Sequence, residues 1–170
     1  MTSLSNAIKL PITVIAVDWH NHDLTRHALE QTVRAINPQS MLIISDKNFM
    51  PGAGWIETTV IDDYTKRDEI FLKGLSDLVE TDYAITVTHD SMIQQIGAWD
   101  PDFRNYDYIE SGGLTLRSRK FMESCLDPRI AMIPGCTESQ VIETFRDRLQ
   151  QVYGVRFAPA EITAKWAALR

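Results

Sequence analysis

Short apolar runs that end in polar residues alternate with amphipathic stretches through the first half of the chain. The runs are rich in β-branched residues and predict buried strands over residues 12–17, 41–45, 56–61 and 83–88. Apolar residues at helical spacing predict helices over residues 24–36, with Asp23 as N-cap, and over residues 67–80. This alternation is typical of an α/β domain with a largely parallel sheet.

The second half of the chain has a less regular pattern. It predicts short helices over residues 91–99 and 119–125 and short strands over residues 106–109 and 114–116. Thr137 and Gln140 have the spacing of a capping box, which opens a helix ending at Gly154. The residues expected to face the core from this helix are Val141, Ile142, Phe145, Leu149 and Val152. Pro159 suits the first turn of a final helix that ends near Leu169.

Composition and charge are those of an ordinary globular domain. Of the 170 residues, 44% are hydrophobic and 24% are charged. The length favours a single domain over residues 1–170, and no apolar run reaches the roughly 18 residues of a membrane-spanning helix. We expect a cytoplasmic protein because the N-terminal segment lacks a secretory pattern, and we expect Cys125 and Cys136 to be reduced.

Several common classes of function are disfavoured. The sequence contains no GxGxxG, Walker A or GxSxG motif, so nicotinamide-cofactor, P-loop and hydrolase functions lack their usual support. The net charge of −6 disfavours a broad nucleic-acid-binding face. Candidate chemistry therefore rests on individual polar groups at the predicted strand ends and in the second half of the chain.

Three predicted strands are followed closely by an aspartate. Asp18 and Asp46 come directly after their strands, and Asp90 comes after the fourth strand with His89 beside it. Because parallel strands bring their carboxyl ends to one edge of a sheet, we expect the three side chains at that edge. They could hold a divalent cation or bind sugar hydroxyls, or they could simply cap turns. Asp90 is the strongest candidate for a cation that bridges to a phosphate.

Other segments offer binding groups that also have ordinary structural explanations. The Trp19 ring could stack on a nucleobase or cover the sheet edge. Gly112 and Gly113 could admit a ligand close to the backbone or form a tight turn. Arg117 could neutralise a phosphate or lie in a solvated helix start. Glu138, in the first turn of the capped helix, could act as a base or only interact with the helix dipole.

Four segments carry a connected pattern: TDYAITVTHDSM, WDPDFRNYDYI, SGGLTLRSRKFME and TESQVIETFRDRLQQVYGVRFAPAEIT. In order and spacing, over roughly residues 81–163, this pattern resembles a family of glycosyltransferase-like domains of unknown function with NGGFSLRSR and YGIRFAP signatures. The resemblance implies a single-domain, Rossmann-like GT-A fold with a mostly parallel sheet flanked by helices. In such folds a nucleotide-sugar donor lies across the strand ends.

The resemblance also implies roles for particular residues. Asp90 falls on the acidic position that would bind Mn²⁺ or Mg²⁺ together with the donor diphosphate. Gly112 and Gly113 fall on a glycine loop near the donor or acceptor. Glu138 matches the first acid of an E-D pair and would be the catalytic base if the transfer inverts; retaining transfer or loss of activity are the alternatives. The second acid of that pair is replaced by Ser139, which cannot serve as a base at neutral pH.

The expected function is transfer of a sugar from a nucleoside diphosphate donor to an acceptor hydroxyl, assisted by a divalent cation. The residues expected at the donor are Asp18, Trp19, Asp46, His89, Gly112, Gly113 and Arg117. One alternative is a catalytically degenerate nucleotide-sugar-binding or interaction module, which Ser139 favours. Another is a nucleotidyltransferase or hydrolase that acts on a nucleotide sugar. The donor nucleotide, the sugar, the acceptor, the stereochemistry of the transfer and the oligomeric state stay open.

Overall fold

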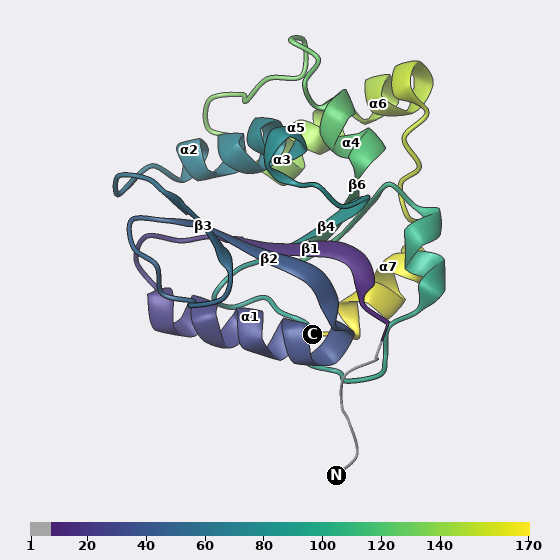
Figure 1. Cartoon of the computed structure of the whole chain (residues 1–170). Coiled ribbons are helices and arrows are strands. Elements are labelled where there is room, and N and C mark those ends of the chain that lie inside the picture. Colours follow the sequence, from purple (N-terminus) through teal and green to yellow (C-terminus); the bar gives the residue numbers. More distant parts are fainter. Residues whose placement is uncertain (1–7) are drawn as a thin grey trace.

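The computed structural model describes residues 8–170, and within them six strands form one sheet (Figure 1). The strand order is β3-β2-β1-β4-β6-β5. The strands are β1 (Leu10–Val17), β2 (Pro38–Ser45), β3 (Gly54–Glu57), β4 (Tyr83–Val87), β5 (Tyr108–Ser111) and β6 (Leu114–Ser118). Strands β1 to β4 pair in parallel, whereas β6 runs antiparallel to both β4 and β5. The α/β class with a mostly parallel sheet is thus confirmed; residues 1–7, part of the predicted domain, lie outside the described residues.

Helices cover both faces of the sheet. They are α1 (His22–Ile36), α2 (Tyr64–Glu69), α3 (Leu75–Leu78), α4 (Arg119–Ser124), α5 (Glu138–Thr144), α6 (Arg146–Tyr153) and α7 (Ala160–Ala167). A π-helical turn, Ile70–Gly74, joins α2 to α3, and residues Pro101–Asn105 form a 3₁₀ turn. In Figure 1, α1 and α7 lie below the sheet, and α2 to α6 lie above it.

The central strand β1 is apolar throughout because both of its faces are buried. Ile12, Val14 and Ala16 belong to one core cluster with residues of α1 and α7. Ile15 and Val17 point to the other face, in a second cluster with residues from the α2–α3 segment. Two-sided burial is the usual environment of a parallel strand and explains why the run does not alternate with polar residues.

Most predicted strands are confirmed, with shifted ends. The third is the most displaced: β3 covers residues 54–57 rather than 56–61, because β2, its only neighbour among the described residues, ends at Ser45 opposite Glu57. Strand β5 covers residues 108–111 rather than 106–109. Asp23 is not the N-cap of α1, since the helix begins at His22 and Asn21 occupies that position. Pro159 is likewise the N-cap of α7 rather than a residue of its first turn.

The predicted helix over residues 91–99 is wrong. This segment is irregular, and its backbone is held by tertiary hydrogen bonds instead of a helical ladder. The Gln94 and Gln95 N–H groups donate to the Leu169 carbonyl at 2.8 and 3.2 Å, and the Ile93 N–H donates to Thr32 Oγ1. These partners come from α1 and the C-terminal segment, so the local pattern could not reveal them.

The capping box of Thr137 and Gln140 is present, with both of its hydrogen bonds formed. The helix that it opens is not continuous: it breaks at Phe145, and α5 and α6 are separate elements. Val152 is 57% exposed, so its predicted core position is wrong. Gly154 ends α6 in the left-handed conformation, as expected for a helix C-terminus.

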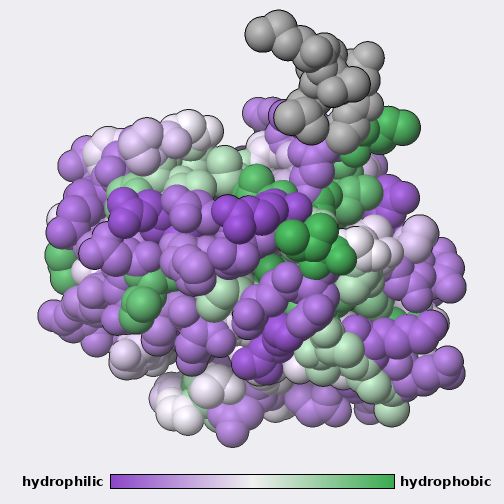
Figure 2. Space-filling model, turned by 90° about the horizontal axis from the view of Figure 1, so that it is seen from below, coloured by the Kyte–Doolittle hydropathy of each residue, from purple (hydrophilic) through white to green (hydrophobic). Residues whose placement is uncertain are grey.

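The surface agrees with the composition. Figure 2, which views the molecule from the side of α1, shows a mostly hydrophilic face with small, separate groups of hydrophobic residues. Both Cys125 and Cys136 are free thiols, as predicted. Among the described residues, no helix has the length and apolar character needed to cross a membrane.

Candidate functional site

The carboxyl ends of β1, β2 and β4 place Asp18, Asp46 and Asp90 at one edge of the sheet, but the three side chains have different partners. Both carboxylate oxygens of Asp18 accept the N–H of Asn21, at 3.1 and 3.0 Å, so this residue holds the turn after β1. The Oδ1 atom of Asp46 lies 2.8 Å from His22 Nε2, and the two side chains are hydrogen-bonded. Asp90 is exposed and accepts a hydrogen bond from Thr88 Oγ1 at 2.7 Å.

One hollow at this edge, which we call the β1 cleft, has a cavity volume of about 190 Å³. It is lined by the end of β1, the start of α1, the start of α2 and the end of β4, including Asp18, Trp19, Thr25, Tyr64 and His89. The indole N–H of Trp19 donates to Thr58 Oγ1 at 2.8 Å, and this hydrogen bond fixes the orientation of the ring. The mixture of aromatic and polar side chains in the lining suits a small organic ligand.

Thr25 gives the β1 cleft an unsatisfied polar group. Its hydroxyl is buried and has no hydrogen-bond partner within the described part of the chain. Buried hydroxyls are normally paired, since leaving one unpaired costs about 1–3 kcal/mol. A ligand hydroxyl, amide or ring nitrogen in the cleft would satisfy this group.

A second hollow, the β6 cleft, continues from the first. Arg67 and Thr88 line both, and the β6 cleft is further lined by β4, β5, β6 and the start of α5. Part of this lining is a polar row across three strands: Thr86 lies opposite Thr115, which lies opposite Glu110. Two hydroxyls of the row, Thr86 Oγ1 and Thr115 Oγ1, are 2.5 Å apart.

A buried ion pair borders the β6 cleft. Arg117 from β6 is 1% exposed and donates to both carboxylate oxygens of Glu138 from α5, at 2.5 and 2.8 Å. Arg117 also donates to the Phe71 carbonyl and to Thr115 Oγ1, both at 2.9 Å. Burial alone would lower the pKa of Arg117, but the facing Glu138 carboxylate raises it above the ordinary value. The guanidinium therefore remains charged and binds groups of the protein itself.

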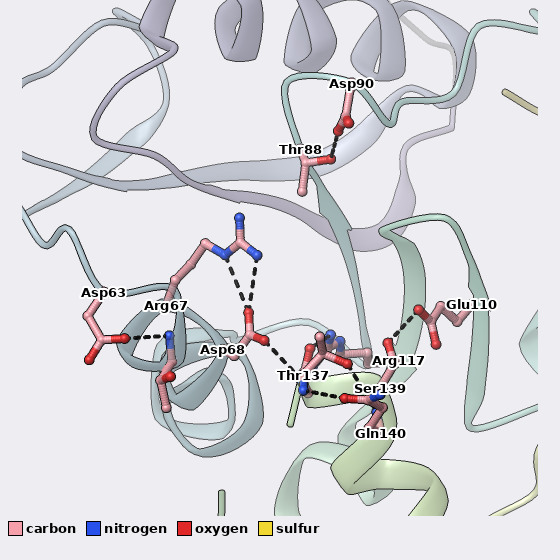
Figure 3. A network of polar contacts seen from close by, with 12 residues as sticks. Asp63, Arg67, Asp68, Thr88, Asp90, Glu110, Arg117, Thr137, Ser139 and Gln140 are labelled. Atoms are coloured by element: carbon pink, nitrogen blue, oxygen red, sulfur yellow. Dashed lines mark hydrogen bonds and ion pairs between the residues drawn. The ribbon is translucent and has the colours of Figure 1, made fainter. Parts of the chain in front are cut away.

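Asp68 joins this pair to the β1 cleft. Its Oδ2 accepts the backbone N–H of Glu138 at 2.9 Å, and its Oδ1 accepts hydrogen bonds from the Arg67 guanidinium at 3.2 and 3.4 Å (Figure 3). The capping box at Thr137 begins α5 at this point, which aims Glu138 at β6 and Ser139 at β5. The network fixes the start of α5 against the sheet edge.

The two glycines between β5 and β6 both have positive φ angles, which side chains other than glycine rarely adopt. Gly113, with φ of 90°, lines the β6 cleft and lies close to the Thr88 hydroxyl, since a Cβ there would come within 3.4 Å of Thr88 Oγ1. Gly112 is exposed, and a Cβ there would project into the Arg170 guanidinium. Gly113 is therefore the one of the two that borders a cleft.

The structure distributes the candidate residues over several environments. Those that line the β1 cleft are Asp18, Trp19 and His89, and those that line the β6 cleft are Gly113, Arg117 and Glu138. Asp46, Asp90 and Gly112 line neither cleft, although Asp90 directly follows Thr88 and His89, which line the β1 cleft. Sequence reasoning missed Thr25, Arg67, Asp68 and Glu110, because only the pairing of distant segments brings these residues to the clefts.

Asp90 is the residue that the sequence suggests for a cation, and its carboxylate is exposed at the end of the segment that follows β4. The hydrogen bond from Thr88 lowers its pKa, so the carboxylate is ionised at neutral pH. Over residues 8–170, no three His, Cys, Asp or Glu side chains form a group that could hold a metal by themselves. A single carboxylate suffices where substrate phosphates and water complete the coordination, which is the usual manner of binding Mg²⁺ in phosphate-handling sites. The donor set at Asp90 fits such a cation.

Comparison with known proteins gives the fold. No protein-family model and no curated protein sequence matches the chain. The chain is similar to the mannosyltransferase PcManGT from Pyrobaculum calidifontis, solved in complex with GDP-Man and Mn²⁺, with a TM-score of 0.55 and 13% identity over 90% of this chain and 56% of that one. It is also similar to the bifunctional IspDF from Campylobacter jejuni, with a TM-score of 0.55 and 10% identity over 86% of this chain and 48% of that one. The chain thus spans about half the length of these proteins and has an α/β fold that a nucleotide-sugar transferase also has.

Proposed function

We propose that this chain binds a nucleoside diphosphate sugar across the β1 and β6 clefts and transfers the sugar to an acceptor hydroxyl. The observation that carries the proposal is the continuity of the two clefts at the carboxyl edge of the sheet, where Arg67 and Thr88 line both. In open α/β sheets, ligands bind outside the carboxyl ends of the strands. The likeness to PcManGT, which was solved with GDP-Man, supports the same choice of ligand.

The β1 cleft is the proposed nucleoside site. Trp19 and Tyr64 supply aromatic surface for a base, and the unpaired Thr25 hydroxyl and the Asp18 carboxylate supply hydrogen-bonding groups. His89 closes the side toward β4. Asp46 has no part in this proposal, because its carboxylate is bound by His22 and, unlike Asp90, it has no neighbour in sequence that lines either cleft.

The diphosphate would lie between the clefts, beside the end of β4. Asp90 would hold Mn²⁺ or Mg²⁺ there together with the phosphate oxygens, and the cation would neutralise the charge of the leaving nucleoside diphosphate. Arg67, which lines both clefts, is the cationic side chain proposed for the phosphates. Arg117 was the residue expected from sequence, but its guanidinium is buried and already bound to Glu138, Phe71 and Thr115.

The β6 cleft would then receive the sugar. Thr86, Thr115 and Glu110 line it with hydroxyl and carboxylate groups, which are suitable partners for sugar hydroxyls. Gly113 leaves space beside Thr88 that a side chain would fill. A second candidate function is binding without transfer, and the observation that favours it is Ser139 at the position where the resembling family carries an acid.

Ligand-induced stabilisation tests the binding step. UDP, GDP, ADP, CDP and dTDP are each added with and without Mn²⁺, and the melting temperature is measured. One of them at about 100 times its dissociation constant stabilises the fold by roughly 2.7 kcal/mol, which corresponds to a rise of about 5–11 °C for a domain of this size. We expect at least one nucleotide to raise the melting temperature, and Mn²⁺ to enlarge this rise. If none of the five nucleotides raises the melting temperature, the nucleotide site is rejected.

The metal assignment is tested by Asp90→Asn. This variant should lose the part of the rise that depends on Mn²⁺ and keep the part that does not. The matched control is Asp82→Asn, which alters an exposed aspartate just before the opposite end of β4. A Mn²⁺-dependent rise that survives in Asp90→Asn would show that the cation binds elsewhere. Release of nucleoside diphosphate from UDP-glucose or GDP-mannose, followed by mass spectrometry, separates transfer or hydrolysis from binding alone.

A further inference from the structure

Glu110 occupies a junction between two hollows of the surface. It lies on β5, is half-buried, and ends the polar row that begins at Thr86 on β4. On one side it lines the β6 cleft, and on the other it lines a third hollow, which we call the α6 cleft. Ser139 is the only other residue that lines both among those described.

The partners of Glu110 distinguish it from the other acids of the β6 cleft. Its Oε1 accepts a hydrogen bond from Ser139 Oγ at 2.5 Å, and its Oε2 accepts one from the Tyr108 hydroxyl at 3.2 Å. Figure 3 shows Ser139 and Glu110 pointing toward each other from the start of α5 and from β5. Within residues 8–170 these two hydroxyls are its polar contacts, so each carboxylate oxygen keeps lone pairs for a further donor.

The other two acids of this cleft are bound by cations. Both oxygens of Glu138 accept from the Arg117 guanidinium, and Asp68 accepts from Arg67 and from the Glu138 backbone. A base must reach the proton that it removes, with a lone pair directed into the cleft. Glu138 directs both oxygens at Arg117 instead, and its carboxylate holds α5 against β6.

We propose that Glu110 is the catalytic base of the transfer and that the α6 cleft holds the acceptor. This inference rests on the proposed function, which puts the donor sugar in the β6 cleft on the other side of Glu110. The lining of the α6 cleft includes hydroxyl and charged side chains and two aromatic rings, among them Ser139, Thr163, Glu143, Arg146, Tyr108 and Phe157. Such a lining fits an acceptor rich in hydroxyl groups, such as another sugar.

The transfer step needs only the donor, the acceptor and the Glu110 carboxylate. The acceptor oxygen attacks C1 of the donor sugar, and a new bond forms between C1 and this oxygen. The bond from C1 to the phosphate oxygen breaks, and the nucleoside diphosphate leaves with the electron pair. The acceptor proton passes to a carboxylate oxygen of Glu110. Attack from the side opposite the diphosphate inverts the configuration at C1.

The first experiment compares Glu110→Gln with the parent chain and with Glu123→Gln, a control on the exposed surface of α4. The readout is hydrolysis of UDP-glucose, UDP-galactose and GDP-mannose, in which water replaces the acceptor and must also lose a proton. We expect Glu110→Gln to lower kcat about 10²–10⁴-fold, the usual contribution of a general base, while donor KM and nucleotide-induced stabilisation stay at the parent values. Glu123→Gln should match the parent in kcat, in donor KM and in nucleotide-induced stabilisation.

Azide distinguishes a base from a residue that only supports the fold. The azide anion attacks C1 without losing a proton, so it needs no base. Adding sodium azide to Glu110→Gln should restore donor turnover and yield a glycosyl azide of inverted configuration, identified by mass spectrometry and NMR. If Glu110→Gln melts as an unfolded chain, Glu110→Asp replaces it, because the shorter side chain withdraws the carboxylate and azide must again restore the rate.

The outcomes separate this inference from the proposed function. Turnover by Glu110→Gln within tenfold of the parent overturns Glu110 as the base, and so does a loss that azide fails to restore. A parent chain that binds nucleotides but turns over none of the donors also overturns the base, while nucleotide binding stands. A parent chain that binds none of the nucleotides overturns the proposed function itself.

Discussion

Replacing Arg117 by Met should destabilise the chain more than any surface charge change. The substitution removes a guanidinium that is 1% exposed and that satisfies three separate acceptors: the Glu138 carboxylate, the Phe71 carbonyl and the Thr115 hydroxyl. Met fills a similar volume, so the main effect is the loss of these contacts rather than a cavity. Glu138 is left as a buried carboxylate without its cation.

The expected magnitude follows from burial. Removing one partner of a buried ion pair costs about 3–5 kcal/mol, because the remaining charge stays out of water without compensation. A domain of this kind has about 5–15 kcal/mol of unfolding free energy in total. At about 2–4 °C per kcal/mol for this size, the melting temperature should fall by about 6–20 °C.

Urea unfolding followed by tryptophan fluorescence measures this loss. The control pair is Arg146 and Glu143, which are 37% and 69% exposed, and Arg146→Met should cost no more than about 1 kcal/mol. Combining Arg117→Met with Glu138→Leu should recover part of the stability, because no unpaired charge then remains. A loss below about 1 kcal/mol for Arg117→Met, equal to the control, would refute the reasoning that this pair is buried and structurally required.

Two further predictions concern titration and thiol reactivity. The Arg129 N–H and the Arg148 guanidinium bind the Asp127 carboxylate and lower its pKa to about 2 from 3.8, so its contribution to stability is present above about pH 4 and lost as the pH falls toward 2. In urea unfolding from pH 7 to 2, Asp127→Asn should be less stable at neutral pH and lose less stability between pH 4 and 2; an unchanged profile would contradict this. Burial raises the pKa of the Cys125 thiol to about 12, so this thiol should not react in the native chain. A thiol reagent should therefore label only Cys136 in the native chain and both cysteines in concentrated urea. Two rapidly reacting thiols in the native chain would contradict this prediction.

The parts of the fold that could be predicted from sequence are those fixed by local pattern. Parallel strands buried on both faces require continuous apolar runs such as residues 12–17, and the turn residues that follow them are short-range signals. The capping box at Thr137 depends on residues three apart, and it is present with both bonds. The edge position of Asp18, Asp46 and Asp90 follows from the parallel arrangement alone.

The parts that could not be predicted depend on pairing between distant segments. Residues 91–99 have apolar spacing that suits a helix. The backbone carbonyl of Leu169 and the Thr32 hydroxyl, however, bind their N–H groups and hold the segment in an irregular conformation. The role of Arg117 as a partner of Glu138 joins β6 to a helix 21 residues further along the chain. The positions of Arg117 and Glu138 in the sequence do not indicate this contact. From the sequence, Arg117 is therefore interpreted as a cation available to a phosphate.

Strands β6 and β5 join the parallel sheet in antiparallel orientation, and they form the β6 cleft beside the β1 cleft. Parallel strands alone would bring loops and helix starts to the edge, as they do in the β1 cleft. By running β6 back alongside β4 and β5 back alongside β6, the fold extends the row from Thr86 through Thr115 to Glu110. Ser139 at the start of α5 then donates to Glu110 instead of repelling it, as a second carboxylate there would do. The serine and the glutamate are therefore compatible parts of one arrangement, in which the strand rather than the helix supplies a carboxylate to the cleft.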